Sequence, residues 1–273
     1  MMLQPSHITE QLENKDFYDI EIFEVLESTN KTLKSMAATD DTLREGKVIL
    51  AESQTGGHGR FGRAFFSPAG TGIYMSILLK PRILPTEAPL ITTAAAVAVA
   101  KALEKICHQP TGIKWINDIF INNRKVCGIL TEASFTSTDS FPKYVVLGIG
   151  INVFEPDGGF PTELNNIASQ AMLSDKNSTP DDINYNRNEI RGKIIASVLD
   201  YLLSFYKELP SRNSFLEEYR NRSLVLGKPI RIMDSPEGTP ATALSIDDNC
   251  NLIVRLENGN TITLNSGEIS IKL

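Results

Sequence analysis

Short stretches that alternate between apolar and polar residues predict that the first half of the chain is rich in β-strands. Glu21–Leu26 shows this alternation, with apolar side chains at Ile22, Phe23 and Val25. The other strands predicted here are Lys47–Ser53, Ile73–Leu79, Gly112–Trp115, Ile119–Ile121, Val126–Ala133 and Tyr144–Val153. Short polar turns separate the later strands, so we expect mainly antiparallel pairing.

Apolar residues at helical spacing predict long helices that cover one face of this sheet. Ser28 is a good N-cap for a helix that runs to about Ala38, and Pro85 opens a long helix that ends near Ile106. Residues 189–208 and 214–222 carry two further helical patterns. The polar, turn-rich stretch Leu173–Arg187 predicts a loop.

From residue 228 onward the pattern changes to short strands. They are predicted at Pro229–Met233, Ala241–Ile246, Asn251–Leu256 and Thr261–Leu264, and Glu257–Asn260 is a hairpin-turn sequence. We therefore divide the chain into two domains, residues 1–222 and 223–273. The first is predicted to be α+β, with a mixed, largely antiparallel sheet covered by helices. The second is predicted to be a small β-barrel of SH3-like size.

Composition narrows the classes of function. The formal net charge of −6 argues against a nucleic-acid-binding surface as the main activity, because such a surface is usually basic. The longest run of small apolar residues, Ala94–Ala100, is too short for a membrane span, which needs about 20 apolar residues. The N-terminal residues are unlike a signal peptide, and the three cysteines lack metal-ligand spacing. We therefore expect a cytoplasmic protein with no membrane association.

The segment Gln54–Phe66 is the first stretch that points to chemistry. It reads Q-T-G-G-H-G-R-F-G-R-A-F-F, so four glycines stand among Arg60 and Arg63. Glycines let backbone N–H groups approach an anion, and arginines suit phosphate or carboxylate oxygens. The segment is neither a Walker A loop nor a dinucleotide fingerprint, because no Gly-Lys-Ser/Thr and no helical pattern follow it. These residues alone support a phosphate-binding loop and a mobile surface loop equally.

Further motifs accompany this loop in a fixed order along the chain. They are Ser28-Thr29-Asn30, Lys114-Trp115-Ile116-Asn117-Asp118, Arg124-Lys125-Val126-Cys127-Gly128 and Gly148-Ile149-Gly150-Ile151-Asn152. The loop matches G-x-G-R-x-G-R at Gly57–Arg63, and Lys114–Asp118 matches K-W-P-N-D with isoleucine in place of proline. In this order the motifs resemble the biotin protein ligase family over roughly Ile22–Val153, and more weakly over the C-terminal segment.

The resemblance implies a class II synthetase-like fold and a two-step, ATP-dependent reaction. Biotin and ATP form biotinyl-5′-adenylate and pyrophosphate, and a lysine of a biotin carboxyl carrier domain then attacks the adenylate and releases AMP. Neither step needs an enzyme nucleophile, so the protein supplies charge stabilisation and positioning. The family pattern gives the catalytic roles to Lys125, Arg60 and Lys114. It places Lys125 between the biotin carboxylate and the phosphate; without the motif, Lys125 would be interpreted as a solvated charge at a strand end.

The resemblance also implies two binding sets. The residues expected to bind biotin are Ser28, Thr29, Asn30, Gln54, Gly57, His58, Gly59 and Gly128. The residues expected to bind ATP or AMP are Arg60, Arg63, Phe65, Asn117, Lys125 and Asn152. Ser28 is equally an ordinary helix N-cap, and core packing is the alternative role for Phe65. His58 stands where arginine is frequent in the family, so its contribution of charge is open.

Several alternatives remain at this point. Asp118 is a candidate Mg²⁺ ligand through one carboxylate and waters, and a turn-capping role suits it equally well. A lipoate-type acyl ligase is the nearest rival, but its R-R-x-x-G-G-G signature is missing from the sequence. A non-catalytic binding module is a third class, and it would be expected to lack the cations.

The residues outside the motifs bear on partners. Roughly twenty residues with no two-helix pattern precede the first core strand, so we expect the form of the family without an N-terminal DNA-binding domain, and no specific DNA binding. The sequence leaves open the acceptor protein, monomer against homodimer, and the contribution of the C-terminal domain.

Overall fold

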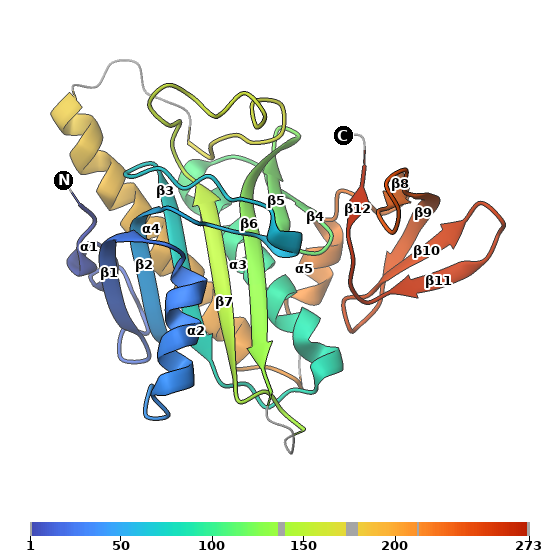
Figure 1. Ribbon diagram of the computed structural model, residues 1–273, viewed down its shortest axis with the longest axis horizontal. Coiled ribbons are helices and arrows are strands. Elements are labelled where there is room, and N and C mark those ends of the chain that lie inside the picture. Colours follow the sequence, from blue (N-terminus) through green and yellow to red (C-terminus); the bar gives the residue numbers. More distant parts are fainter. Residues whose placement is uncertain (1, 136–139, 173–179, 212, 272–273) are drawn as a thin grey trace.

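The computed structural model describes residues 2–135, 140–172, 180–211 and 213–271. Figure 1 shows a central sheet with helices on both faces and a smaller sheet beside it. Within the described residues, seven strands form the central sheet in the order β1-β2-β3-β7-β6-β5-β4. Their bounds are β1 Asp19–Leu26, β2 Lys47–Gln54, β3 Gly72–Leu79, β4 Gly112–Lys114, β5 Asp118–Ile121, β6 Arg124–Ser134 and β7 Tyr144–Asn152.

The sheet is mixed and largely antiparallel, which confirms the predicted fold class. In the spatial order of the sheet, every pair of neighbouring strands between β2 and β4 is antiparallel. β1 and β2 instead run parallel, with Asp19 opposite Lys47, and this pair makes the sheet mixed. The reason is α2 (Thr29–Thr39), which lies between the two strands in the chain and returns it to the same end of the sheet.

The two faces of the sheet carry different layers. α2 covers one face, whereas α3 (Ala88–Cys107) and α4 (Pro180–Tyr206) cover the other (Figure 1). Successive side chains of β3 point to opposite faces of the sheet. Ile73 and Met75 belong to the large core under α3 and α4, whereas Leu78 packs with Leu33 of α2. Helices therefore cover both faces rather than the single face predicted. No helix in the described part of the chain is long and apolar enough to cross a membrane.

α4 begins earlier than the sequence pattern predicted. It starts at Pro180, inside the stretch Leu173–Arg187 for which a loop was expected; residues 173–179 lie outside the described part of the chain. Pro180 followed by Asp181 and Asp182 is a helix-start sequence. Proline is tolerated in the first turn, and acidic residues are stabilised near the positive end of the helix dipole. The overall polarity of the stretch concealed this signal.

The remaining helices are short and connect the layers. α1 (Pro5–Thr9) was not predicted, and two 3₁₀ turns lie at Arg60–Gly62 and Pro85–Glu87. α5 (Leu216–Asn221) falls inside the helix expected over residues 214–222.

The C-terminal sheet confirms the predicted small β-domain. Within the described residues its order is β11-β10-β9-β8-β12, with every pair antiparallel. The bounds are β8 Pro229–Ile232, β9 Thr239–Ile246, β10 Leu252–Leu256, β11 Thr261–Leu264 and β12 Ile269–Ser270. The Trp115 indole donates a 2.9 Å hydrogen bond to the carbonyl of Cys250, which fastens this domain to the central one. The division between residues 222 and 223 stays a prediction.

Candidate active site

A cavity of about 560 Å³ lies on the α2 face of the central sheet. Its floor is formed where β3, β7 and β6 pair, with Ser76 opposite Gly148 and Gly128 opposite Gly150. Small residues on three adjacent strands leave the space that larger side chains would fill. The cavity is therefore a consequence of the glycine pattern in the strands.

The buried start of α2 forms one side of the cavity. Ser28 is the N-cap, and Ser28, Thr29 and Asn30 are each less than 5 % exposed. The Thr29 backbone N–H donates a 2.8 Å hydrogen bond to the side chain of Gln54, at the end of β2. Gln54 in turn donates to the hydroxyl of Ser67 at 3.0 Å. These uncharged groups are already held in place by one another.

Asn30 depends on a close approach to β7. A Cβ atom on Gly148 would lie only 2.1 Å from the side-chain oxygen of Asn30, so only glycine leaves room for this amide. Ser76, fully buried on β3, holds the same oxygen at 2.6 Å. Gly148 and Ser76 thus determine where the Asn30 amide lies.

The glycine–arginine loop, residues 56–66, forms the opposite side and is folded as a tight hairpin. The N–H of Gly59 donates to the carbonyl of Arg63 at 2.8 Å, and the N–H of Phe65 donates to the carbonyl of Gly57 at 2.8 Å. The sequence suggested that backbone N–H groups of this loop approach an anion. Here the amides of Gly59 and Phe65 are used inside the hairpin, so these two N–H groups do not serve an anion.

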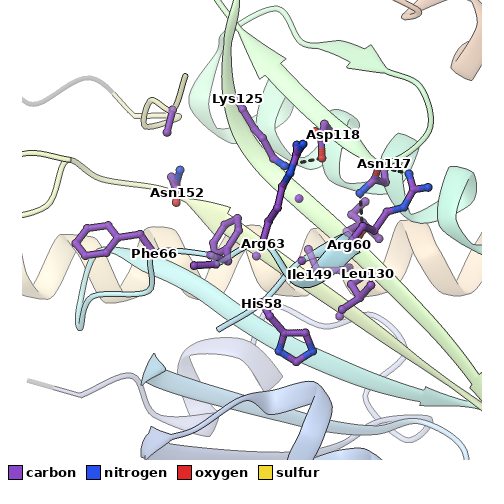
Figure 2. Close-up of a pocket in the computed structure, with 18 of the residues that line it drawn as sticks. His58, Arg60, Arg63, Phe66, Asn117, Asp118, Lys125, Leu130, Ile149 and Asn152 are labelled. Atoms are coloured by element: carbon purple, nitrogen blue, oxygen red, sulfur yellow. Dashed lines mark hydrogen bonds and ion pairs between the residues drawn. The ribbon is translucent and has the colours of Figure 1, made fainter. Parts of the chain in front are cut away.

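Four cations line the cavity near this loop, and most of them are held by groups of the protein (Figure 2). The ammonium of Lys125 lies 2.7 Å from the carboxylate of Asp118. Arg60 donates to the side chain of Asn117 at 3.2 Å and to the carbonyl of Gly267 at 2.7 Å. These contacts bring the loop, the β4–β5 turn and the C-terminal domain together at one end of the cavity.

The other two cations differ in their surroundings. Arg63 forms an ion pair of 2.5 Å with Glu268 of the C-terminal domain, and 68 % of its side chain is exposed. Lys114 is half-buried, and burial lowers its pKa despite the opposing effect of Asp118 and Glu268. Burial likewise lowers the pKa of Arg60, which stays charged at neutral pH. Bringing an anion here relieves the cost of holding several cations together away from water.

Asp118 is the carboxylate closest to the role of a metal ligand. One of its oxygens is buried, and its contact with Lys125 is an ion pair rather than an aligned hydrogen bond. The described residues contain no cluster of three or more histidine, cysteine, aspartate or glutamate side chains that would hold a metal ion by itself. The donor set therefore fits a Mg²⁺ ion bound mostly by phosphate oxygens and waters, with one carboxylate from the protein.

Aromatic residues line the end of the cavity next to Asn152. The Phe65 ring lies against Gly150, where a Cβ atom would approach the ring to 2.7 Å, and it meets Tyr74 edge-on. Residues 160–168 close this end, because the backbone of Lys125 pairs with Ile167 at 2.8 Å. An aromatic ring and an amide at one end of a cavity suit a nucleobase.

Nearly all residues predicted for the site line this one cavity. Those that line it are Ser28, Thr29, Asn30, Gln54, His58, Gly59, Arg60, Arg63, Phe65, Lys114, Asn117, Asp118, Lys125, Gly128 and Asn152. Gly57 does not line it; a Cβ atom there would meet the Ser67 hydroxyl at 2.7 Å, so this glycine serves loop packing. The exposed His58 points away from Lys125 and Asp118 (Figure 2), which disfavours a charge contribution to that group.

The sequence analysis assigned no individual role to several residues that the structure brings to the site, although Gly148 and Gly150 belong to one of its motifs. They are Tyr74, Ser76, Gly148, Gly150, Phe160, Leu164 and Glu268. A polar Ser76 inside the apolar strand β3, and glycines two apart in β7, were the available signals for three of them. Glu268 had no local signal, because its role depends on the docking of the C-terminal domain.

Comparisons with known proteins identify the family to which this fold and cavity belong. The model of the Biotin/lipoate A/B protein ligase family matches residues 22–152, and that of the Biotin protein ligase C terminal domain matches residues 225–272. The chain belongs to the biotin protein ligase family.

Individual relatives agree with this assignment. The chain is similar to the Bifunctional ligase/repressor BirA of Bacillus subtilis, with 41% identity over 146 residues, which are 54% of this chain and 44% of that protein. It therefore spans less than half the length of that relative. It is also similar to the Biotin--[acetyl-CoA-carboxylase] ligase of Mycobacterium tuberculosis, with 29% identity over 89% of this chain and 85% of that one. Among solved structures, the biotin protein ligase from Aquifex aeolicus in complex with biotin and ATP has a TM-score of 0.70 at 25% identity, covering 93% of this chain and 98% of that one.

Proposed function

We propose that this protein is an ATP-dependent biotin ligase. It forms biotinyl-5′-adenylate from biotin and ATP, and it transfers the biotinyl group to a lysine of a biotin carboxyl carrier domain. The observation that carries the proposal is a single cavity with two unlike sides: the uncharged groups of Ser28, Thr29, Asn30 and Gln54, and the cations Arg60, Arg63, Lys114 and Lys125. We call these the biotin side and the phosphate side.

The two sides suit the two substrates. Biotin carries a neutral cyclic urea that needs hydrogen-bond partners and a carboxylate that needs a cation, and ATP carries a triphosphate and a flat base. The carboxylate oxygen attacks the α-phosphorus and pyrophosphate leaves, so two anions must meet. Lys125 supplies the charge that offsets their repulsion, and Arg60 and Lys114 bind phosphate oxygens. Phe65 and Asn152 receive the adenine.

In the second step the acceptor lysine attacks the carbonyl carbon of the adenylate, and AMP leaves with the bonding electrons. No side chain of the protein forms a covalent bond in this sequence, and the protein acts by positioning. We propose Asp118 as the residue that holds Mg²⁺ together with the phosphates; the ion when bound neutralises phosphate charge. The acceptor domain, a homodimer and a cytoplasmic location stay predictions.

A direct test is pyrophosphate release by the purified protein with ATP, Mg²⁺ and biotin, and with each component left out in turn. Incorporation of labelled biotin into a purified carrier domain then tests the transfer step. Release that does not depend on biotin contradicts the proposal. Lipoate-type ligation is the second candidate, because the matching family model covers both classes, and lipoate in place of biotin in the same assay distinguishes them.

A further inference from the structure

A chain of hydrogen bonds leads from the biotin side of the cavity to an ion pair outside it. The hydroxyls of Thr29 and Ser76 are 2.8 Å apart, and the Ser76 hydroxyl lies 2.6 Å from the Asn30 Oδ1. The Asn30 Nδ2 donates to Glu132 on β6 at 2.9 Å, and Lys34 of α2 holds the other oxygen of that carboxylate at 2.6 Å. We call the contacts from Thr29 to Glu132 the relay. Glu132 and Lys34 do not line the cavity, so neither side chain contacts a ligand there directly.

The direction of every hydrogen bond in the relay follows from Glu132. Burial raises the pKa of this carboxyl, but hydrogen bonds from Lys34 and Asn30 outweigh burial and lower it overall, so Glu132 is ionised and only accepts. The Asn30 amide must therefore turn its Nδ2 to Glu132 and its Oδ1 to Ser76. That oxygen can only accept a hydrogen bond, so Ser76 donates its single hydroxyl proton to Asn30.

These contacts also determine the direction in which the Thr29 hydroxyl donates its proton. The 2.8 Å contact between the two hydroxyls is aligned for Ser76 as the donor. A hydroxyl has one proton, however, and that of Ser76 is already used on Asn30, so we assign Thr29 as the donor in this contact. Gln54 does not compete strongly for this proton, since its oxygen receives the Thr29 backbone N–H at 2.8 Å and lies 3.2 Å from the Thr29 hydroxyl. Thr29 lines the cavity, and its hydroxyl oxygen can therefore act toward a ligand only as an acceptor.

We propose that Glu132, held by Lys34, is a positioning residue for biotin: through Asn30 and Ser76 it fixes the Thr29 hydroxyl so that its oxygen accepts an N–H of the cyclic urea. The identity of the ligand rests on the proposed function. A hydroxyl free to rotate would present its proton to the urea N–H in part of the population, and two donors facing each other in a buried site are costly. The relay prevents the Thr29 proton from facing the urea N–H, and it does so before the ligand binds.

The decisive variant reverses the relay and keeps the ion pair. In Lys34→Glu/Glu132→Lys the two charges exchange places, so the group next to Asn30 is a donor instead of an acceptor. The Asn30 amide then turns its Oδ1 toward the ammonium, and its Nδ2 donates to the Ser76 hydroxyl. The Ser76 proton then goes to Thr29, and Thr29 directs its own proton toward Gln54 and the cavity. We expect the Kd for biotin, measured by calorimetry, to rise about 10- to 30-fold, with the Kd for ATP and the melting temperature little changed.

The conservative variant Glu132→Gln separates the relay from a purely structural ion pair. A glutamine oxygen still accepts from Asn30, so the relay keeps its direction, and the expected loss of biotin affinity is only about two- to three-fold. If the pair merely fastens α2 to β6, the order reverses: the swap is mild, and Glu132→Gln is the more damaging change. The swap Glu189→Lys/Lys193→Glu, at an exposed pair on α4, is the matched control and should leave biotin affinity unchanged.

Ser76→Ala cuts the relay at an uncharged position and covers the case in which the swap does not fold. We expect its Kd for biotin to rise about five-fold, with unchanged ATP affinity. Wild-type biotin affinity in the folded swap or in Ser76→Ala overturns the inference. A wild-type protein that binds no biotin overturns the proposed function instead, and the inference with it.

Discussion

The two sides of the cavity are prepared for their substrates in opposite ways. On the biotin side, Ser28, Thr29 and Asn30 are buried, uncharged and locked by hydrogen bonds to neighbours that need not move. On the phosphate side, Lys125 and Arg63 are paired with the carboxylates Asp118 and Glu268. The first arrangement is preorganised, whereas the second contains the protein's own anions where phosphate must come. The difference teaches that affinity for biotin depends on packing, and affinity for ATP depends on the exchange of ion pairs.

The largest expected effect comes from removing the cation that both substrates share. Lys125→Ala should reduce the rate of pyrophosphate release by about 100- to 1,000-fold, because a charge contact made mainly in the transition state is lost. The melting temperature should change little, since Lys125 is paired at a cavity wall and not in the core. Lys143→Ala, which breaks a surface ion pair of the same 2.7 Å length with Asp41, is the control. Near-normal release by folded Lys125→Ala would remove this lysine from the mechanism.

A single added methyl group should weaken binding on the preorganised biotin side. Gly148→Ala places a Cβ atom 2.1 Å from the side-chain oxygen of Asn30, so the amide must leave its position. We expect the KM for biotin to rise on the order of 30-fold, because overpacking costs roughly 1–3 kcal/mol and misplaces a binding group. The KM for ATP should stay within about two-fold. Equal changes in both constants would show that the two sides are not independent.

Arg60 tests how the loop retains the intermediate. Arg60→Gly removes the contacts with Asn117 and Gly267, so the loop loses its attachment to the other wall of the cavity. Free biotinyl-adenylate in solution should increase about ten-fold, as should labelling of bystander lysines, because a loop that is not held cannot exclude water or keep the phosphate. Arg124→Gly, at an exposed arginine outside the cavity, is the matched control. An unchanged amount of free adenylate would show that Arg60 does not close the loop.

The smallest effect should be a gain. Glu268→Gln frees Arg63 from its anion, so phosphate no longer has to displace a carboxylate, and the KM for ATP should fall about two- to three-fold. The gain is small because the Arg63 side chain is 68 % exposed and the ion pair is screened by water. Combining Glu268→Gln with Arg63→Ala should abolish the gain. A rise in KM for Glu268→Gln alone would instead give Glu268 a direct role with the nucleotide.

The sequence identified the residues that line the cavity better than it identified their partners. Lys114–Asp118 and Gly57–Arg63 are continuous motifs, and strand and loop patterns around them placed them correctly. The parallel pairing of β1 with β2 depends on how a helix crosses the sheet, which no local pattern encodes. The contact between Arg63 and Glu268 joins residues far apart in the chain, so neither residue alone predicts the other.

Ser76 shows a different limit on what can be predicted from the sequence. Within the apolar strand β3, a single serine is ordinary, and its position is functional only because Gly148 and Asn30 meet it from two other elements. The relay needs hydrogen-bond distances between three elements, and these exist only in the fold. Residues that act through others are therefore harder to predict from sequence than those that touch the ligand.

The hydrogen bond between Arg60 and Gly267 has a consequence for synthesis on the ribosome. The two residues are 207 positions apart, so the loop emerges long before the residue that holds it. Because N-terminal domains fold first during translation, the seven-stranded sheet and the biotin side can form while the wall made by the C-terminal domain is still missing. We therefore expect a stage in which the nascent chain can hold biotin while the nucleotide end is open to water. Under the proposed role of Arg60, the chain gains the ability to retain a reactive adenylate only when synthesis reaches the C-terminal sheet.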